Sequence, residues 1–347
     1  MQKNASLDMT QGNPVKLLIL FAIPMFIGGV FQLMYNMVDT IVVGRYVSIE
    51  ALAAIGATSS TIMFFMQMGG GMTNSLSVIV SQAEGARQTD RLKKAVSHAL
   101  YLVLFGGVLL GLIAFFGARP LMELLGTPKN IISDSVKYIR IVGGLTIALM
   151  SYNGVSAVLR AIGDSRTPLF FLILCSLLNV VLDLLFVLAL NLGVAGVAWA
   201  TILSQCTSAV LCVSYMLKKY PRLRPDAEAW QFDGEMIREY VRIGVPMCLQ
   251  SAALCIGMFV ITAVINSYGS DTVAAFTIGS KVEQLATVSF SNLAFSLSVF
   301  AGQNFGAQRY DRIKEGLRKG LIKPAAAPVQ IHRAGRRQGT GDRPSAV

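Results

Sequence analysis

Long stretches without charged residues constrain the fold of this chain more than any other feature of its sequence. Four stretches contain no Asp, Glu, Lys or Arg: 51–83, 141–159, 191–217 and 243–266. A fifth, 167–190, contains only Asp183. Because about 20 helical residues cross the hydrocarbon core of a bilayer, such runs are typical of transmembrane helices. An ordinary soluble enzyme is excluded, since only 14% of the residues are charged, against roughly 25% in soluble domains.

We predict an all-α polytopic membrane protein with eight transmembrane helices. The helices are expected over residues 17–43, 51–83, 95–118, 141–159, 167–190, 194–217, 243–266 and 272–302. The turn at Asn191-Leu192-Gly193 divides an apolar region that is too long for one helix. The first apolar run is too long for the core of a signal peptide and no small-residue cleavage site follows it, so we expect it to be retained.

The distribution of basic residues predicts the orientation in the membrane. If the N-terminus is cytoplasmic, the cytoplasmic segments hold at least nineteen Lys and Arg residues, and the outer segments hold at most five: Arg45, Arg119, Lys129, Lys137 and Arg140. This asymmetry is the positive-inside pattern of plasma-membrane proteins. The net charge of +11 therefore reflects membrane topology, with the lipid bilayer as partner, and nucleic-acid binding is not expected. The five cysteines lack Cys-x-x-Cys spacing and the two histidines are far apart, so neither a disulfide framework nor a zinc site is predicted.

The chain contains an internal repeat. Residues 82–93 and 303–314 are identical at six of twelve positions, and each segment follows the second predicted helix of its half. Shorter segments correspond in nearly the same register: Ile23-Pro24-Met25 with Val245-Pro246-Met247, and Ile55-Gly56 with Ile278-Gly279. Six predicted helices separate the copies, so both enter the membrane from the same side, as in transporters built from parallel repeats.

The repeat predicts the domain organisation. We expect a six-helix N-terminal lobe over 1–217, a cytoplasmic linker over 218–242, and the first two helices of a second lobe over 243–321. A complete second copy would need about 220 residues and would end near position 450, so we expect a truncated or frame-shifted chain whose missing helices are absent or are supplied by another chain. Residues 322–347 are rich in Pro, Ala, Gly and Arg and are predicted to form a disordered tail outside the repeat.

Polar side chains inside the predicted helices form a candidate ion site. The first helix carries four of them on one face, at the spacing i, i+3, i+4 and i+7: Gln32, Tyr35, Asn36 and Asp39. Asn179 and Asp183 share a face of the fifth helix, and Thr201 lies in the sixth. The rise of about 1.5 Å per residue places Asp39, Asp183 and Thr201 roughly 6–12 Å below the outer ends of their helices.

This set of oxygen atoms predicts a site for Na⁺ or a proton. A carboxylate in mid-membrane costs about 2.5–3.5 kcal/mol, so it is expected to be functional or paired. Carboxylate, amide and hydroxyl oxygens bind small hard cations, and two neighbouring carboxylates can share a proton. We predict that Asp39, Asn179, Asp183 and Thr201 bind the cation, with no other cofactor and no catalytic residue. The alternative is that Asn179 and Thr201 only hydrogen-bond between helices and that Asp39 reaches the outer interface.

Two prolines interrupt predicted helices at corresponding positions of the repeat. Pro24 and Pro246 each remove a backbone hydrogen bond, and the ring clashes with the preceding turn, so each is expected to kink its helix. Both are candidate hinges, and a static bend is the alternative.

Several polar motifs in this sequence resemble those of the multidrug and toxic compound extrusion (MATE) family. The motifs are Asn13-Pro14, Ile23-Pro24-Met25, Tyr35-Asn36-Met37-Val38-Asp39-Thr40, Val43-Gly44-Arg45-Tyr46, Ala51-Leu52-Ala53-Ala54-Ile55-Gly56, Arg160-Ala161-Ile162-Gly163-Asp164 and Gln303-Asn304-Phe305-Gly306-Ala307. The resemblance covers residues 10–321 and implies two six-helix lobes that export cationic or amphipathic drugs in exchange for Na⁺ or protons. It also implies that the first-lobe cation site falls on Asp39, Asn179, Asp183 and Thr201, and that the first helix bends at Pro24. The acids that some members carry in the seventh and tenth helices have no counterpart in this chain.

Three other functions remain alternatives to a cation-coupled drug exporter. A non-transporting fragment of such an exporter is the strongest of them. A flippase for lipid-linked precursors is disfavoured, because the predicted cavity shows no excess of positive charge for phosphate. An intramembrane aspartyl protease would need two membrane aspartates, but no Gly-x-Gly-Asp sequence surrounds Asp39 or Asp183. The sequence does not identify the drug or choose between Na⁺ and protons.

Overall fold

The computed structural model describes residues 6–266 and 270–319, and all regular structure within them is helical. The helices are α1 (Pro14–Tyr46), α2 (Ile49–Gly85), α3 (Thr89–Leu124), α4 (Ile132–Val142), α5 (Thr146–Ala161), α6 (Arg166–Leu184), α7 (Gly193–Lys219), α8 (Gly234–Asn266), α9 (Ser270–Gly306) and α10 (Tyr310–Leu317). A π-helical turn, η1 (Leu185–Ala189), follows α6, and a 3-10 turn, η2 (Pro221–Leu223), follows α7. The predicted all-α membrane class is confirmed, whereas the predicted tail 322–347 lies outside the described residues.

Within the described part of the chain, 6 helices are long and apolar enough to cross a membrane, or 7 if the bent pair α4–α5 forms one span. These segments make the chain a multi-pass membrane protein. The eighth predicted span, 272–302, falls on α9, which is not among them, and stays a prediction.

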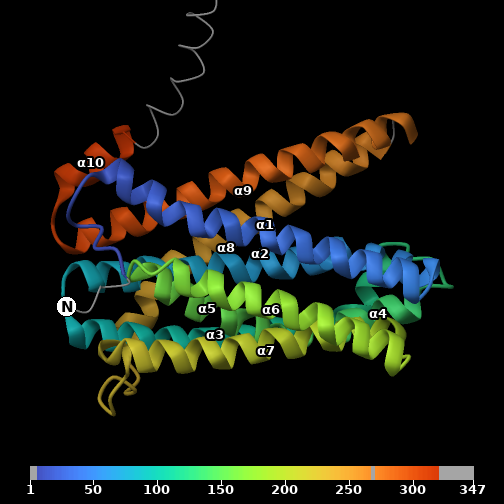
Figure 1. Cartoon of the computed structure of the whole chain (residues 1–347), viewed down its shortest axis with the longest axis horizontal. Helices are drawn as coiled ribbons and strands as arrows, with labels where there is room; N and C mark the ends of the chain where they lie inside the picture. The colour runs from blue at the N-terminus through green and yellow to red at the C-terminus, as the bar shows by residue number, and fades with distance from the viewer. Residues whose placement is uncertain (1–5, 267–269, 320–347) are drawn as a thin grey trace, which may run out of the picture.

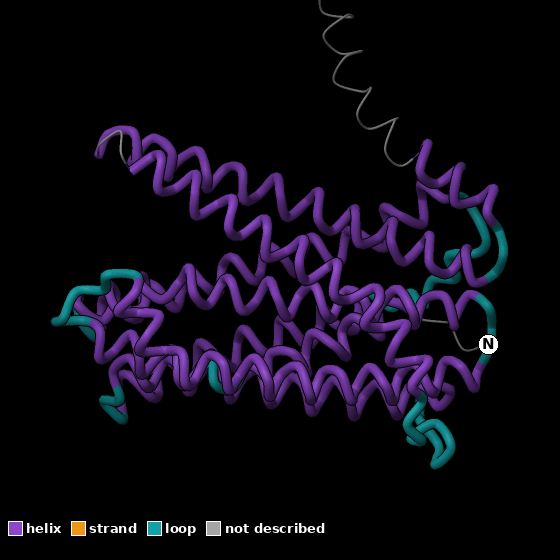
Figure 2. Tube along the Cα trace, turned by 180° about the vertical axis from the view of Figure 1, so that it is seen from behind, coloured by secondary structure: helices purple, strands orange, loops and turns teal. Residues whose placement is uncertain are grey.

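The helices run antiparallel to one another, so every second connection lies at the same end (Figure 1). We call the end that holds Asp8, Arg87, Arg222 and Arg309 the basic end, where Arg87 pairs with Asp8, Arg222 with Glu84, and Arg309 donates to the Thr10 carbonyl. Helices α1–α7 form a bundle, and the α8–α9 hairpin packs on it through α2 and α1. Both views show this hairpin leaving the bundle toward the opposite end (Figures 1 and 2). The two parts of the chain therefore meet mainly at the basic end.

Helix starts follow local capping chemistry. The Asn13 side chain accepts hydrogen bonds from the Val15 and Lys16 amides, at 3.0 and 3.4 Å, and Pro14 occupies the first turn of α1, where no amide donor is needed. The Ser48 hydroxyl accepts from the Ala51 amide at 3.0 Å and caps α2. Polar residues at these junctions thus satisfy the amides that a helix leaves unpaired.

The fourth predicted span, 141–159, differs from the structure. It consists of two helices, α4 and α5, bent by 42° at the short break between them. Gly143 and Gly144 lie at the break, and a Cβ on Gly111 of α3 would press on the Gly144 carbonyl. The close passage of α3 therefore needs glycine on both sides. The span begins nine residues before its predicted start. The charged residues Lys137 and Arg140 lower the hydropathy of α4, so its buried apolar face was not recognised in the sequence.

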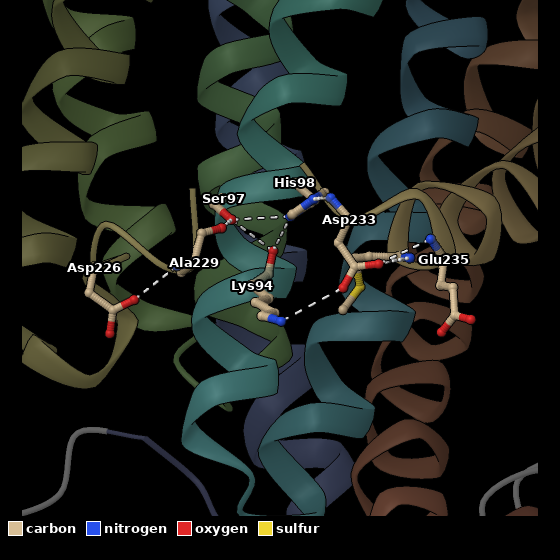
Figure 3. Close-up of polar contacts among 8 residues, drawn as sticks. Lys94, Ser97, His98, Asp226, Ala229, Asp233 and Glu235 are labelled. Carbon is tan, nitrogen blue, oxygen red and sulfur yellow. Dashed lines mark hydrogen bonds and ion pairs between the residues drawn. The ribbon is translucent and has the colours of Figure 1, made fainter. Parts of the chain in front are cut away.

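The connection between α7 and α8, which lies within the predicted linker 218–242, is docked on α3 (Figure 3). His98 of α3 is fully buried, and its Nε2 accepts a 2.9 Å hydrogen bond from the Asp233 amide. Because Nε2 accepts, the ring proton lies on Nδ1, which donates to the Lys94 carbonyl at 2.8 Å. The Asp233 carboxylate accepts from the amides of Glu235 and Met236, at 3.0 and 3.1 Å, at the start of α8. The first turn of α8 is thus fixed to α3.

Candidate functional site

Two carboxylates from different helices meet inside the bundle. Asp39 of α1 and Asp183 of α6 come close because α1 packs along α6, and their carboxyl groups lie within electrostatic range of each other. Asp183 is fully buried, and neither of its oxygens has a hydrogen-bond partner among the described residues. The buried Oδ1 of Asp39 has none there either. Two ionised carboxylates that lie close together repel each other, so a bound cation or a shared proton would stabilise this pair.

Asn179 lies one helical turn from Asp183 and is 1% exposed. Its side-chain oxygen and nitrogen are both buried, and neither has a hydrogen-bond partner in the part of the chain that the structure describes. An unpaired buried amide costs about 1–3 kcal/mol. The α6 face thus presents one carboxylate and one amide whose polar atoms are free to bind an ion.

Thr201, the fourth predicted ligand, lies on α7, which packs beside α6. Its hydroxyl donates to the Val197 carbonyl at 3.0 Å, within its own helix. Since that bond uses the proton, the oxygen lone pairs remain available to a cation. The side chain is partly buried.

The remaining predicted residues of the α1 face differ in their surroundings. Tyr35 is partly buried and lies within electrostatic range of Asp39 and Asp183. Gln32 is also partly buried, and no described interaction joins it to the carboxylates. Asn36 is exposed, and its only described interaction is a hydrogen bond from the Thr40 hydroxyl to its backbone carbonyl, at 2.8 Å. The structure therefore brings Tyr35 to the pair and leaves Asn36 outside it.

Two features near the carboxylates were missed at the level of sequence. Tyr138 of α4 lies within electrostatic range of both Asp39 and Asp183. It falls outside the predicted span 141–159, in the helix α4 that precedes most of that span. The π-helical turn η1 begins two residues after Asp183. Such turns are rare in proteins, and those that do occur are often found at functional sites.

The donor set suits a hard cation or a proton. No group of three or more His, Cys, Asp or Glu residues in the described ranges could hold a metal ion. The α1 and α6 faces present two carboxylates and one amide with unpaired buried atoms, and Tyr35 and Tyr138 lie within electrostatic range of the carboxylates. Oxygen ligands of this type bind small, hard cations. The orphaned atoms of Asn179 and Asp183 are the observation that fits such an ion.

The candidate hinges lie within continuous helices. Pro24 is buried inside α1, fifteen residues before Asp39, and Pro246 lies inside α8. A movement of α1 at Pro24 would displace Asp39 relative to Asp183, because Pro24 lies toward the basic end of the helix and Asp39 beyond it.

The motif Arg160-Ala161-Ile162-Gly163-Asp164 builds a fixed junction at the basic end. The Asp164 side chain is fully buried and accepts hydrogen bonds from the Thr167 hydroxyl and the Tyr220 hydroxyl, both at 2.6 Å. Lys219 forms an ion pair with it at 3.2 Å. Burial by itself would raise the pKa of the Asp164 carboxyl, but these hydrogen bonds and the Lys219 charge outweigh it and hold the pKa below its usual range. Asp164 thus ties the start of α6 to the end of α7.

The sequence is similar to those of known transporters. A family model described as MatE matches residues 24–185 and 246–324. The probable multidrug resistance protein YpnP of Bacillus subtilis is 32% identical over 311 residues, which cover 88% of this chain and 68% of the relative. The multidrug export protein MepA of Staphylococcus aureus is 22% identical over 334 residues, 95% of this chain and 72% of the relative. The chain thus spans about two thirds of the length of YpnP.

Solved structures share the fold. A MOP superfamily transporter from Pyrococcus furiosus superposes with a TM-score of 0.85 at 24% identity, over 93% of this chain and 71% of that chain. A MATE family transporter in an outward-facing conformation gives the same values. At this identity the likeness concerns the fold alone.

Proposed function

Since this chain belongs to the MatE family of membrane transporters, we propose that it exports drugs and other xenobiotics across the cell membrane in exchange for entering Na⁺ or protons. The names of the relatives support drug export. One observation carries the proposal of cation coupling: the closeness of Asp39 and Asp183, whose buried oxygens have no hydrogen-bond partner among the described residues.

The basic end faces the cytoplasm in this proposal, because Lys and Arg are retained on that side. Asp39 then lies seven residues before the outer end of α1, about 10 Å below it at 1.5 Å per residue. A cation entering from outside reaches the pair after crossing only part of the membrane. Each charge that moves inward through 100 mV gains about 2.3 kcal/mol, which is enough to bias a two-state transition.

The cation acts on the carboxylate pair. Na⁺ held by Asp39, Asp183, Asn179 and Thr201, or a proton shared by the two carboxylates, removes their repulsion and draws α1 toward α6. Because Pro24 leaves one backbone carbonyl of α1 without its usual donor, the helix bends there at low cost. This movement lowers the affinity for drug on the inner surface of the bundle and couples cation entry to drug release.

The test is ethidium export from energised cells of an efflux-deficient bacterium that expresses the 347-residue chain. Added Na⁺ or a collapsed proton gradient identifies the coupling ion. We expect cation-dependent export that Asp183→Asn abolishes and that the exposed-site control Asn36→Ala retains. Normal coupled export in both Asp39→Asn and Asp183→Asn would overturn cation coupling at this site.

Failure of the wild type would be informative if the protein is present in the membrane. No export would overturn the proposal for this chain alone and favour a non-transporting fragment. Export that returns only on co-expression with the C-terminal helices of a relative, which do not export alone, would indicate that another chain supplies further helices. Translocation of a lipid-linked precursor without ethidium export would favour the flippase.

A further inference from the structure

The two copies of the sequence repeat contact each other at the basic end. Residues 82–93 begin at the end of α2 and residues 303–314 at the end of α9, and these two helices pack together there. A Cβ on Gly85 would overlap the backbone carbonyl of Gln303. A Cβ on Gly306 would overlap the backbone carbonyl of Gln82. At both points one backbone passes directly against the other, and no side chain fits between them.

These two contacts are equivalent by symmetry. Gln82 corresponds to Gln303 in the repeat, and Gly85 corresponds to Gly306. Exchanging the copies converts the contact of Gly85 with Gln303 into the contact of Gly306 with Gln82. Such reciprocal pairing is the property of an interface crossed by a two-fold axis. The crossing of α2 and α9 therefore lies on the axis that relates the two copies.

Glycine is required at this crossing for steric reasons. Small residues allow transmembrane helices to approach backbone to backbone, and an added methyl group would push the helices apart. Gly302, one turn before Gly306, also faces α2, where a Cβ would overlap the Ser81 hydroxyl. The corresponding glycines Gly56 and Gly279 have open space around them, since no heavy atom of the described residues lies within 4 Å of an added Cβ.

Hydrogen bonds reinforce the crossing through the N-terminal segment. The buried side chain of Gln303 accepts from the Met9 amide at 3.0 Å and donates to the Ala161 carbonyl at 2.7 Å. The Asn304 side chain donates to the Met9 carbonyl at 3.0 Å. The Leu7 amide donates to the Gly163 carbonyl at 3.0 Å. Residues 7–10 thus join the α5–α6 connection to the end of α9.

We propose that the crossing of Gly85 with Gln303 and of Gly306 with Gln82 positions the two halves of the transporter in the state closed at the basic end. This inference rests on the proposed function, because a transporter must open alternately on each side. The halves touch at the crossing, and the α8–α9 hairpin leaves the bundle toward the opposite end (Figure 1). The crossing must therefore part before the pathway between the halves opens at the basic end.

The test measures the distance between the halves with spin labels. The labels are placed at Asp90 and Asp311, which are exposed and correspond in the repeat, in a full-length chain whose five cysteines are replaced. Gly85→Ala and Gly306→Ala are expected to lose the short-distance population and to gain a longer one. The matched controls Gly56→Ala and Gly279→Ala, on the same two helices, are expected to keep the short distance.

A distance distribution in Gly85→Ala and Gly306→Ala that equals that of the controls would overturn the proposal. If either variant fails to elute as a folded protein, Gln303→Ala replaces it, because this change removes hydrogen bonds without adding volume. Gln303→Ala is expected to shift the same distance toward longer values, and an unchanged distance would equally overturn the proposal. Loss of cation-dependent export in the wild type would count against the proposed function alone, since the distance is measured without transport.

Discussion

The Tyr220 hydroxyl donates a 2.6 Å hydrogen bond to the Asp164 carboxylate, whose side chain has no exposed surface. This bond connects the residue after α7 to the turn before α6. We expect Tyr220→Phe to lower the free energy of unfolding by about 1.5–3 kcal/mol, as is usual for a hydrogen bond to a charged group. Thermal unfolding in detergent checks this value. Tyr310→Phe is the control, because Tyr310 is exposed, and an equal loss there would contradict the assignment.

The same carboxylate makes stability depend on pH in a defined direction. Its folded-state pKa is below the usual carboxyl value of about 3.9. Asp164 therefore stabilises the fold fully above that value, and the contribution is lost as the pH falls through the lower, folded-state pKa. We expect the midpoint of thermal unfolding to fall on acidification below about pH 4, and to fall less in Asp164→Asn. An identical acid profile in Asp164→Asn would contradict this prediction.

Neutralising one carboxylate of the pair should remove the contribution of the membrane potential to export. Asp183→Asn removes the charge that would hold a cation, so the membrane potential no longer acts through this site. A potential of 100 mV contributes about 2.3 kcal/mol per charge, equivalent to about 50-fold in rate or equilibrium. We expect the cation-dependent part of ethidium export to be lost, which lowers total export by up to that factor, while the amount of protein in the membrane is unchanged. Immunoblots of membrane fractions provide the control for expression.

Substitution of Thr201 should have a smaller effect on cation affinity than substitution of Asp183. Replacing its hydroxyl in Thr201→Val removes one neutral oxygen ligand and leaves the carboxylates in place. A loss of about 1 kcal/mol corresponds to roughly a fivefold higher concentration of Na⁺ or protons for half-maximal export. Thr201→Ser keeps the hydroxyl and is expected to match the wild type. Equal cation dependence in Thr201→Val and the wild type would remove Thr201 from the site.

Substitutions of His98 should show how much the hydrogen bond between Asp233 and His98 contributes to stability. In His98→Leu the partly buried Asp233 amide loses its acceptor, which costs about 1 kcal/mol. His98→Gln places an amide oxygen near the position of Nε2 and is expected to recover part of that loss. Thermal unfolding of the two variants gives the comparison. If His98→Leu were as stable as His98→Gln, the hydrogen bond to Asp233 would not contribute.

The helices were largely predictable from the sequence, because charge-poor runs report the part of each helix that lies in the hydrocarbon core. Their ends were not, since α1, α2 and α3 continue for several residues beyond the predicted runs into polar sequence. Hydropathy does not register a helical turn that lies in water. The start of α4 was wrong for a related reason, because Lys137 and Arg140 lie on the same short helix as its buried apolar face.

The candidate site shows what helical spacing can and cannot determine. The spacing of the α1 residues placed Tyr35 and Asp39 on one face, and the structure brings both to Asp183. The same spacing included Asn36, which lies at the edge of that face and is exposed. It could not indicate Tyr138, because a contact between α4 and α1 depends on packing between helices, which no single-helix pattern contains.

The docking of residues 7–10 also determines when the fold can be completed. Met9 bonds to Gln303, which is 294 residues later in the chain. At 5–20 residues per second, a ribosome needs about 15–60 seconds to add that length. The hydrogen bonds between Met9 and the end of α9 therefore form only after α9 has been synthesised and inserted. Completion of the fold therefore depends on residues 7–10 as much as on α9.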